Sequence, residues 1–153
     1  MAISRADVIT QTQKKRELFS DFLDSFAASP VGGNLAKSIN ENAVRQSIKN
    51  LILTELGGID INTGSRLAGE RLFQPLIGSD VTRSLFEPNN ILTESVIINT
   101  IENTIKYYEP RAKEVNVSIL PSDDEHYLII NVVFSVINNP NPIDLTLNLR
   151  RVR

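Results

Sequence analysis

The sequence contains no cysteine and no tryptophan, and it has one histidine and one methionine among 153 residues. The absence of cysteine excludes disulfides, thiolate metal sites and a cysteine nucleophile, and it is typical of a reducing compartment. A single histidine, His126, leaves little material for histidine-based catalysis or for a multi-histidine metal site. The composition therefore offers few groups for enzymatic chemistry, and we expect no cofactor and no metal.

Strong net charge and long hydrophobic runs are missing as well. The net charge is −2, so no overall field directs the chain to nucleic acid or to anionic lipid. The apolar stretches are too short to span a membrane, and the N-terminus lacks the apolar core of a signal peptide. With 41% hydrophobic residues, the chain is expected to be a soluble intracellular protein with one cored domain, without nucleic-acid or membrane partners.

The N-terminal part has helical spacing between residues 3 and 28. The larger apolar residues at that spacing are Phe19, Phe22, Leu23 and Phe26. The sequence "SPVGGN" then predicts the end of this helix. The aromatic stripe fits either a core face or an arm that docks on another protein. We divide the chain into an N-terminal helical arm, residues 1–35, and an α+β domain, residues 36–153.

Three helices are predicted in the middle of the chain. The sequence "SINE" matches a capping box with Ser38 and Glu41, and a helix follows to about Leu56, before two glycines. Residues 57–80 are predicted to form a long loop, with at most a short strand. The sequence "SDVTRSLFEP" predicts a short helix capped by Ser79 or Asp80. The clearest helix spans residues 92–108, because isoleucine recurs every four residues and Pro110 ends the pattern.

Three strands follow this helix. Val115, Val117 and Ile119 alternate with polar residues, and the run "YLIINVVFSVI" is apolar on both faces, as in a central strand. "PSDDEH" and "NNPNP" predict the turns, and residues 143–150 alternate again. The fold class is therefore α+β, with helices first and then a small antiparallel meander of about three to four strands.

The last strand of such a meander has a free side. It contains no proline after Pro142 and no signal for a bulge, so its edge invites pairing with another strand. Two interpretations remain open. Either a loop or arm of the chain covers the edge, or a partner adds a strand to it.

Catalytic and cation-binding patterns are weak. Glu87, Glu94 and Glu109 lie at or near helix ends, but a glycosidase needs two carboxylates at a defined separation, which the sequence does not give. The acidic run at 122–126 lacks the spacing of a calcium loop and is interpreted as a solvated hairpin turn that includes His126. The sequence "GGIDINTGS" lacks the lysine of a phosphate-binding loop.

The junction between the long helix and the first strand carries Glu109, Pro110 and Arg111. The fixed proline makes the backbone stiff there, and arginine can form a paired, planar contact with a carboxylate. One interpretation is a helix end with two solvated charges, which would add little stability. The other is a rigid, charged elbow at the surface on which a partner docks.

Three runs together resemble a known family. They are "GERLFQPLIGSDVTRSLFEP", "LTESVIINTIENTIKYYEPR" and "VNVSILPSDDEHYLIINVVFSVINNP". Over roughly residues 40–150 the chain is similar to the baseplate wedge, or sheath-initiator, proteins of contractile-tailed phages, once called lysozyme-like, whose hallmark is a Glu-Pro-Arg triplet after a long helix. The loop 74–78 departs from the family pattern, and so does the long, aromatic N-terminal part.

The resemblance implies a structural, non-enzymatic role in a virion, at the tail baseplate, after assembly in the host cytoplasm. It implies a fold like the C-terminal domain of the sheath subunit, and a six-fold arrangement with other wedge proteins, sheath subunits and tail-tube proteins as partners. Glu109, Pro110 and Arg111 would dock on the wedge core. A strand of the first sheath ring would add to the last strand, at Leu145, Thr146, Leu147, Asn148 and Leu149.

Two alternatives accompany this hypothesis. The same role in a type VI secretion system or an extracellular injection machine shares the mechanism and differs only in the assembly. A peptidoglycan-cleaving enzyme is suggested by the old family name but not by the residues.

Overall fold

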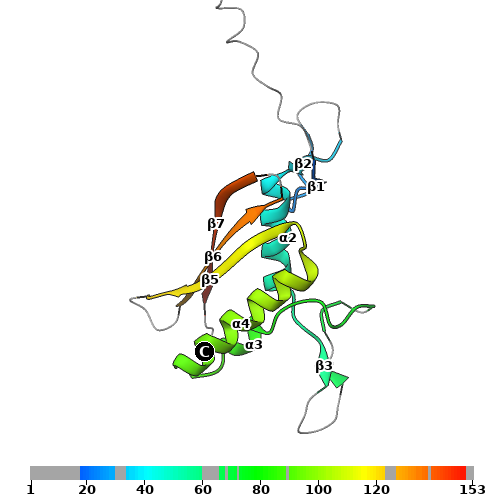
Figure 1. Cartoon of the computed structure of the whole chain (residues 1–153). Helices are drawn as coiled ribbons and strands as arrows, with labels where there is room; N and C mark the ends of the chain where they lie inside the picture. Colours follow the sequence, from blue (N-terminus) through cyan, green and yellow to red (C-terminus); the bar gives the residue numbers. More distant parts are fainter. Residues whose placement is uncertain are drawn as a thin grey trace, which may run out of the picture.

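The computed structural model shows an α+β fold in which two long helices pack against a three-stranded antiparallel sheet (Figure 1). The elements are β1 (Ser20–Phe22), β2 (Lys37–Ile39), α2 (Glu41–Leu53), β3 (Gly58–Ile59), β4 (Arg66–Leu67), α3 (Val81–Ser84), α4 (Ile91–Tyr108), β5 (Ala112–Leu120), β6 (Tyr127–Val136) and β7 (Asn139–Arg150). The structure describes residues 18–29, 34–59, 66–67, 69–71, 73–88, 90–122, 127–137 and 139–150. The predicted fold class is confirmed.

The main sheet has the strand order β5-β6-β7, which is the predicted meander. Its inner face carries the buried side chains Val117, Leu128, Ile130, Val132, Phe134, Ile143, Leu145 and Leu147. The opposite face of β6 is only half-buried, at Ile129, Asn131 and Val133. The predicted central position of β6 is confirmed, although this face is less buried than the inner one. The helices α2 and α4 pack on the inner face, where they form one core with the sheet.

The helices α2 and α4 close the core. Ile97, Ile101 and Ile105 of α4 are at most 2% exposed, and they pack with Ile48 and Ile52 of α2. The four-residue repeat places these side chains along one stripe of each helix. Burying each such side chain contributes about 1.5–3 kcal/mol to folding. The helix predicted over 92–108 is confirmed with one residue more at its start.

The start of α2 differs from the predicted capping box. Ser38 lies in β2, and the N-cap is Asn40, whose φ is 51° and whose side chain makes no cap hydrogen bond. Glu41 instead accepts a hydrogen bond from Nδ2 of Asn139 at 2.6 Å, which ties the start of α2 to the start of β7. The helix ends at Leu53, with Thr54 as the C-cap, before the predicted end at Leu56.

The helix predicted over residues 3–28 is wrong for its described part. Residues 20–22 form β1, which pairs antiparallel with β2 (Figure 1). Oδ1 of Asn40 accepts from the backbone N–H groups of Leu18 at 2.8 Å and Phe19 at 3.3 Å. These long-range contacts override a local helical spacing. Residues 3–17 lie outside the described residues, and the division of the chain at residue 35 stays a prediction.

The start of β7 also differs from the sequence prediction. The predicted turn "NNPNP" is shorter, because the strand already begins at Asn139. The register shifts between the pairs Val136↔Asn139 and Phe134↔Ile143, so the segment with both prolines forms an irregularity in the ladder. From Ile143 to Arg150 the pairing with β6 is regular. A turn, and not a bulge, was predicted at this position.

Candidate functional site: the Glu109–Arg111 elbow and the β7 edge

The elbow begins where α4 ends. Glu109 has φ −127° and ψ 71°. It thus lies outside the helical region, which a following proline disfavours. The N–H of Ala112 donates to the carbonyl of Glu109 at 3.1 Å and closes a turn with Pro110 at its second position. Proline favours that position because its φ is already suitable. The turn redirects the chain from α4 into β5.

The two charges of the elbow form a paired contact. Nε and Nη2 of Arg111 each lie 2.6 Å from a different carboxylate oxygen of Glu109. The Glu109 side chain is 2% exposed and that of Arg111 is 30% exposed, while Pro110 is exposed. Both sequence interpretations are therefore corrected for Glu109, which is neither solvated nor at the surface. Only Pro110 and the outer part of Arg111 remain accessible.

Neighbouring groups keep Glu109 ionised. Burial raises the pKa of its carboxyl, but hydrogen bonds with Arg111 and Ser47, together with the Arg111 charge, outweigh burial and hold that pKa below its ordinary value. The hydrogen bond to Glu109 raises the pKa of Arg111. A glycosidase general acid needs the opposite, a carboxyl whose pKa is raised. Glu109 is thus suited to an ion pair and not to proton donation.

Two partners of the elbow were missed by sequence reasoning. Ser47 lies on α2, and no pattern in the sequence pointed to it. The ring of Phe19 lies under the guanidinium of Arg111, 5.4 Å from its centroid, in a cation–π contact. Phe19 belonged to the predicted aromatic stripe; it packs against the core and also contacts Arg111. The elbow therefore joins α2, α4, β5 and the segment before β1.

The loop 74–78 is hydrogen-bonded to the last turns of α4, which lead into the elbow. The hydroxyl of Tyr108 donates to the carbonyl of Leu76 at 2.9 Å, and the hydroxyl of Thr104 donates to the carbonyl of Gly78 at 3.1 Å. Both acceptors are backbone groups. The departure of this loop from the family pattern therefore leaves these two contacts in place.

The β7 edge is the second candidate site. Among the described residues β7 pairs only with β6, so the predicted edge position is confirmed for that part of the chain. Leu145 and Leu147 are 8% and 6% exposed and face the core, whereas Thr146 and Asn148 are exposed on the opposite face. The predicted pairing segment, Leu145 to Leu149, lies in the regular part of the strand.

The structure offers little to the other candidates. No group of three or more His, Asp or Glu side chains within the described ranges could hold a metal ion. No helix among the described residues is long and apolar enough to cross a membrane. Glu87 is exposed and Glu94 is half-exposed. The turn residues 123–126, with His126, lie outside the described residues.

Comparisons with known proteins agree on one family. The family model described as "Baseplate wedge protein gp25" matches residues 39–141, more than half of the chain. The chain is similar to baseplate wedge protein gp25 of Enterobacteria phage T4, with 35% identity over 108 residues. That match covers 71% of this chain and 76% of the phage T4 protein.

Two solved structures have a similar fold. A chain in the cryo-EM structure of the anti-feeding prophage baseplate matches with a TM-score of 0.56 at 21% identity, covering 88% of this chain and 87% of that one. A Geobacter sulfurreducens protein described as a tail lysozyme matches with a TM-score of 0.55 at 20% identity, covering 72% of this chain and 89% of that one. At these identities the likeness shows the fold alone.

Proposed function

This chain belongs to the baseplate wedge protein gp25 family, and from that premise we propose that it is a structural subunit of the tail baseplate of a contractile-tailed phage. The match over residues 39–141 is the observation that carries this proposal, because it includes the elbow and most of the core. A chain of similar fold lies in a six-fold symmetrised baseplate. The partners that we propose for this chain are likewise other baseplate proteins, in a six-fold arrangement around a tail tube. Assembly would take place in the host cytoplasm.

The first proposed contact is with the wedge core, through the elbow. Pro110 and the outer part of Arg111 form the accessible surface, and Glu109 fixes the position of Arg111 from inside. A guanidinium held by a bidentate pair and by the Phe19 ring has lost most of its freedom before it meets a partner. Such preorganisation lowers the entropic cost of docking.

The second proposed contact is with the sheath. An exposed strand edge accepts a further strand through backbone hydrogen bonds, which set the register and direction of the added chain. The edge of β7 between Leu145 and Leu149 would accept a strand of the first sheath ring in this way, and would so initiate sheath polymerisation. A likeness to the C-terminal domain of the sheath subunit belongs to the same proposal.

Deleting β7 would not isolate this role, because Ile143, Leu145 and Leu147 belong to the core. The test is therefore made on the intact protein. Baseplate–tube complexes with and without the protein are mixed with cognate sheath subunits, and sheaths are counted by electron microscopy. Sheath growth from complexes that lack the protein would refute the initiation role.

Amide hydrogen exchange then locates the contact. Successive amides of a strand point to opposite sides, so about half of the β7 amides between 144 and 149 have no partner strand before assembly. Those amides are expected to become protected when sheath is added to the baseplates. Amides of β4, which lies in a separate hairpin, serve as the control. Unchanged exchange in β7 would mean that the sheath attaches elsewhere.

Two alternatives have direct tests. Neighbouring genes distinguish a phage tail from a secretion or injection machine, which would use the same contacts. Cell-wall clearing measured by turbidity tests for a peptidoglycan-cleaving enzyme, and clearing that is abolished by Glu109→Gln would overturn the structural assignment. We expect no clearing, because Glu109 is buried and ionised.

A further inference from the structure

A groove lies between α2, the β1–β2 ribbon and the edge of β7. Its volume is about 480 Å³. Apolar side chains from three segments line it, namely Leu23, Ile39 and Leu145. Leu145 also belongs to the proposed pairing segment, so the groove adjoins that segment of β7.

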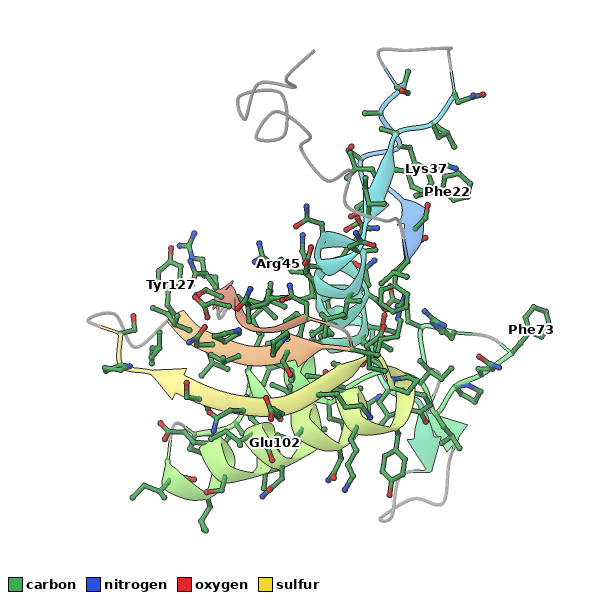
Figure 2. All side chains as sticks on the ribbon, turned by 45° about the horizontal axis from the view of Figure 1, so that its top comes forward. Phe22, Lys37, Arg45, Phe73, Glu102 and Tyr127 are labelled. Atoms are coloured by element: carbon green, nitrogen blue, oxygen red, sulfur yellow. The ribbon has the colours of Figure 1, made fainter. Side chains whose placement is uncertain are left out.

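The groove is also basic. Lys37, Arg45 and Lys49 line it, and Asp24 is the only carboxylate among its described lining residues. Figure 2 shows two of the cations, Arg45 on α2 and Lys37 on the ribbon beside it. Asp24 already accepts a hydrogen bond from Asn50 at 3.0 Å. Within the described ranges none of the three cations forms an ion pair.

This clustering of charge does not help the protein to fold. Arg45 and Lys49 are one helical turn apart on the same face of α2, and such like-charge pairs destabilise a helix by about 0.2–0.5 kcal/mol. The chain as a whole carries a net charge of −2, so a groove with three cations runs against its overall sign. Local charge of this kind attracts and orients a partner of opposite sign.

We propose that the groove binds an acidic, extended segment of the protein chain that adds a strand to β7. Apolar side chains of that segment would contact Leu23, Ile39 and Leu145, and its carboxylates would pair with Lys37, Arg45 and Lys49. This inference rests on the proposed strand addition for the identity of the partner. The chemistry of the groove itself can be tested without any sheath.

Two labelled peptides of equal length are the probes, one alternating valine with glutamate and the other alternating valine with glutamine. Fluorescence anisotropy measures their binding to the full-length protein at low and at high salt. The acidic peptide is expected to bind about ten-fold more tightly at low salt, and added salt removes the preference. The double variant Arg45→Gln, Lys49→Gln is expected to abolish the preference.

The matched control is the double variant Lys106→Gln, Lys113→Gln, which makes the same change in net charge at exposed positions outside the groove. It should keep the preference. Absence of binding by the acidic peptide, equal binding of both peptides, or equal losses in both double variants would overturn the inference. If the preference holds but the sheath does not attach at β7, the groove assignment stands and the strand-addition proposal fails.

Discussion

Glu109 is the residue on which most of the elbow depends. Its carboxylate is 2% exposed and lies 2.6 Å from two nitrogens of Arg111. Removing one partner of a buried ion pair leaves the charge of the other uncompensated. A substitution at either position is therefore expected to destabilise the protein. For this reason Arg111→Glu is not suitable for testing the docking contact, although at a solvated surface it would be expected to leave the fold intact. It would place a second carboxylate beside the buried one.

Replacement of Glu109 by glutamine tests the pair with little change in shape. At pH 7 we expect Glu109→Gln to lower the free energy of unfolding by about 1.5–3 kcal/mol, the range for hydrogen bonds to charged groups. Urea unfolding measures the change. Glu102→Gln is the control. Glu102 lies in α4, the helix that Glu109 caps, and it makes no hydrogen bond or ion pair with another described residue. It should change the stability by less than about 0.5 kcal/mol.

The same comparison across pH checks the charge state. The pKa of Glu109 is lowered in the folded protein from its ordinary value of 4.5, so the unfolded chain binds more protons in that range and stability rises with pH. The stabilisation is complete above pH 4.5 and is lost as the pH falls through the lower, folded-state pKa. The difference between wild type and Glu109→Gln should therefore shrink in acid. A constant difference would contradict the ionised pair.

At the scale of elements, sequence patterns predicted the helices and strands that bury one face. The four-residue isoleucine repeat of α4 and the alternation in β7 follow from burial on one side of each element, so they were visible in the sequence. The strand β1 was not visible, because its pairing with β2 depends on residues far along the chain. The elbow was predicted as a charged turn, but its inward pairing depends on Ser47 and Phe19, which only the fold brings there.

The loop behind the elbow allows an element-scale prediction. Gly78 has φ +140°, and a Cβ added there would lie 2.5 Å from the carbonyl oxygen of Thr54. Gly78→Ala should therefore lower the free energy of unfolding by about 1–3 kcal/mol, as expected for a residue forced into a sparsely populated backbone conformation. Gly58→Ala is the control, because a Cβ there meets nothing within 4 Å. Thermal unfolding of both variants should separate them clearly, and equal losses would contradict the close approach.

At the scale of the whole molecule, many large apolar side chains remain outside the core. Phe73 is 93% exposed and points away from the body of the protein in Figure 2. Ile91 and Leu92 are 81% and 77% exposed at the start of α4, and Val96 continues the same face at 56%. Contiguous apolar surface of this kind is typical of proteins that are covered in an assembly. The isolated chain therefore exposes surface that the baseplate would bury.

Two faces of one helix should consequently respond in opposite ways. The double variant Leu92→Gln, Val96→Gln is expected to keep the free energy of unfolding within about 1 kcal/mol and to reduce self-association of the isolated protein. Ile97→Ala, one residue further along but 2% exposed, should cost about 2–5 kcal/mol. Urea unfolding and sedimentation velocity measure the two effects. If self-association is unchanged in the double variant, this face of α4 does not mediate it.

The strand β7 also decides how the molecule bears force. It runs antiparallel to β6 in regular register from Ile143 to Arg150, and the bonds between the strands lie perpendicular to the strand axis. A pull along β7 therefore loads all of those bonds at the same time, in shear, instead of opening them one after another. If a contracting sheath pulls on a strand paired with β7, the load passes into this ladder and then into the leucines of the core. The attachment would resist tension along its length and would yield most easily to peeling from one end.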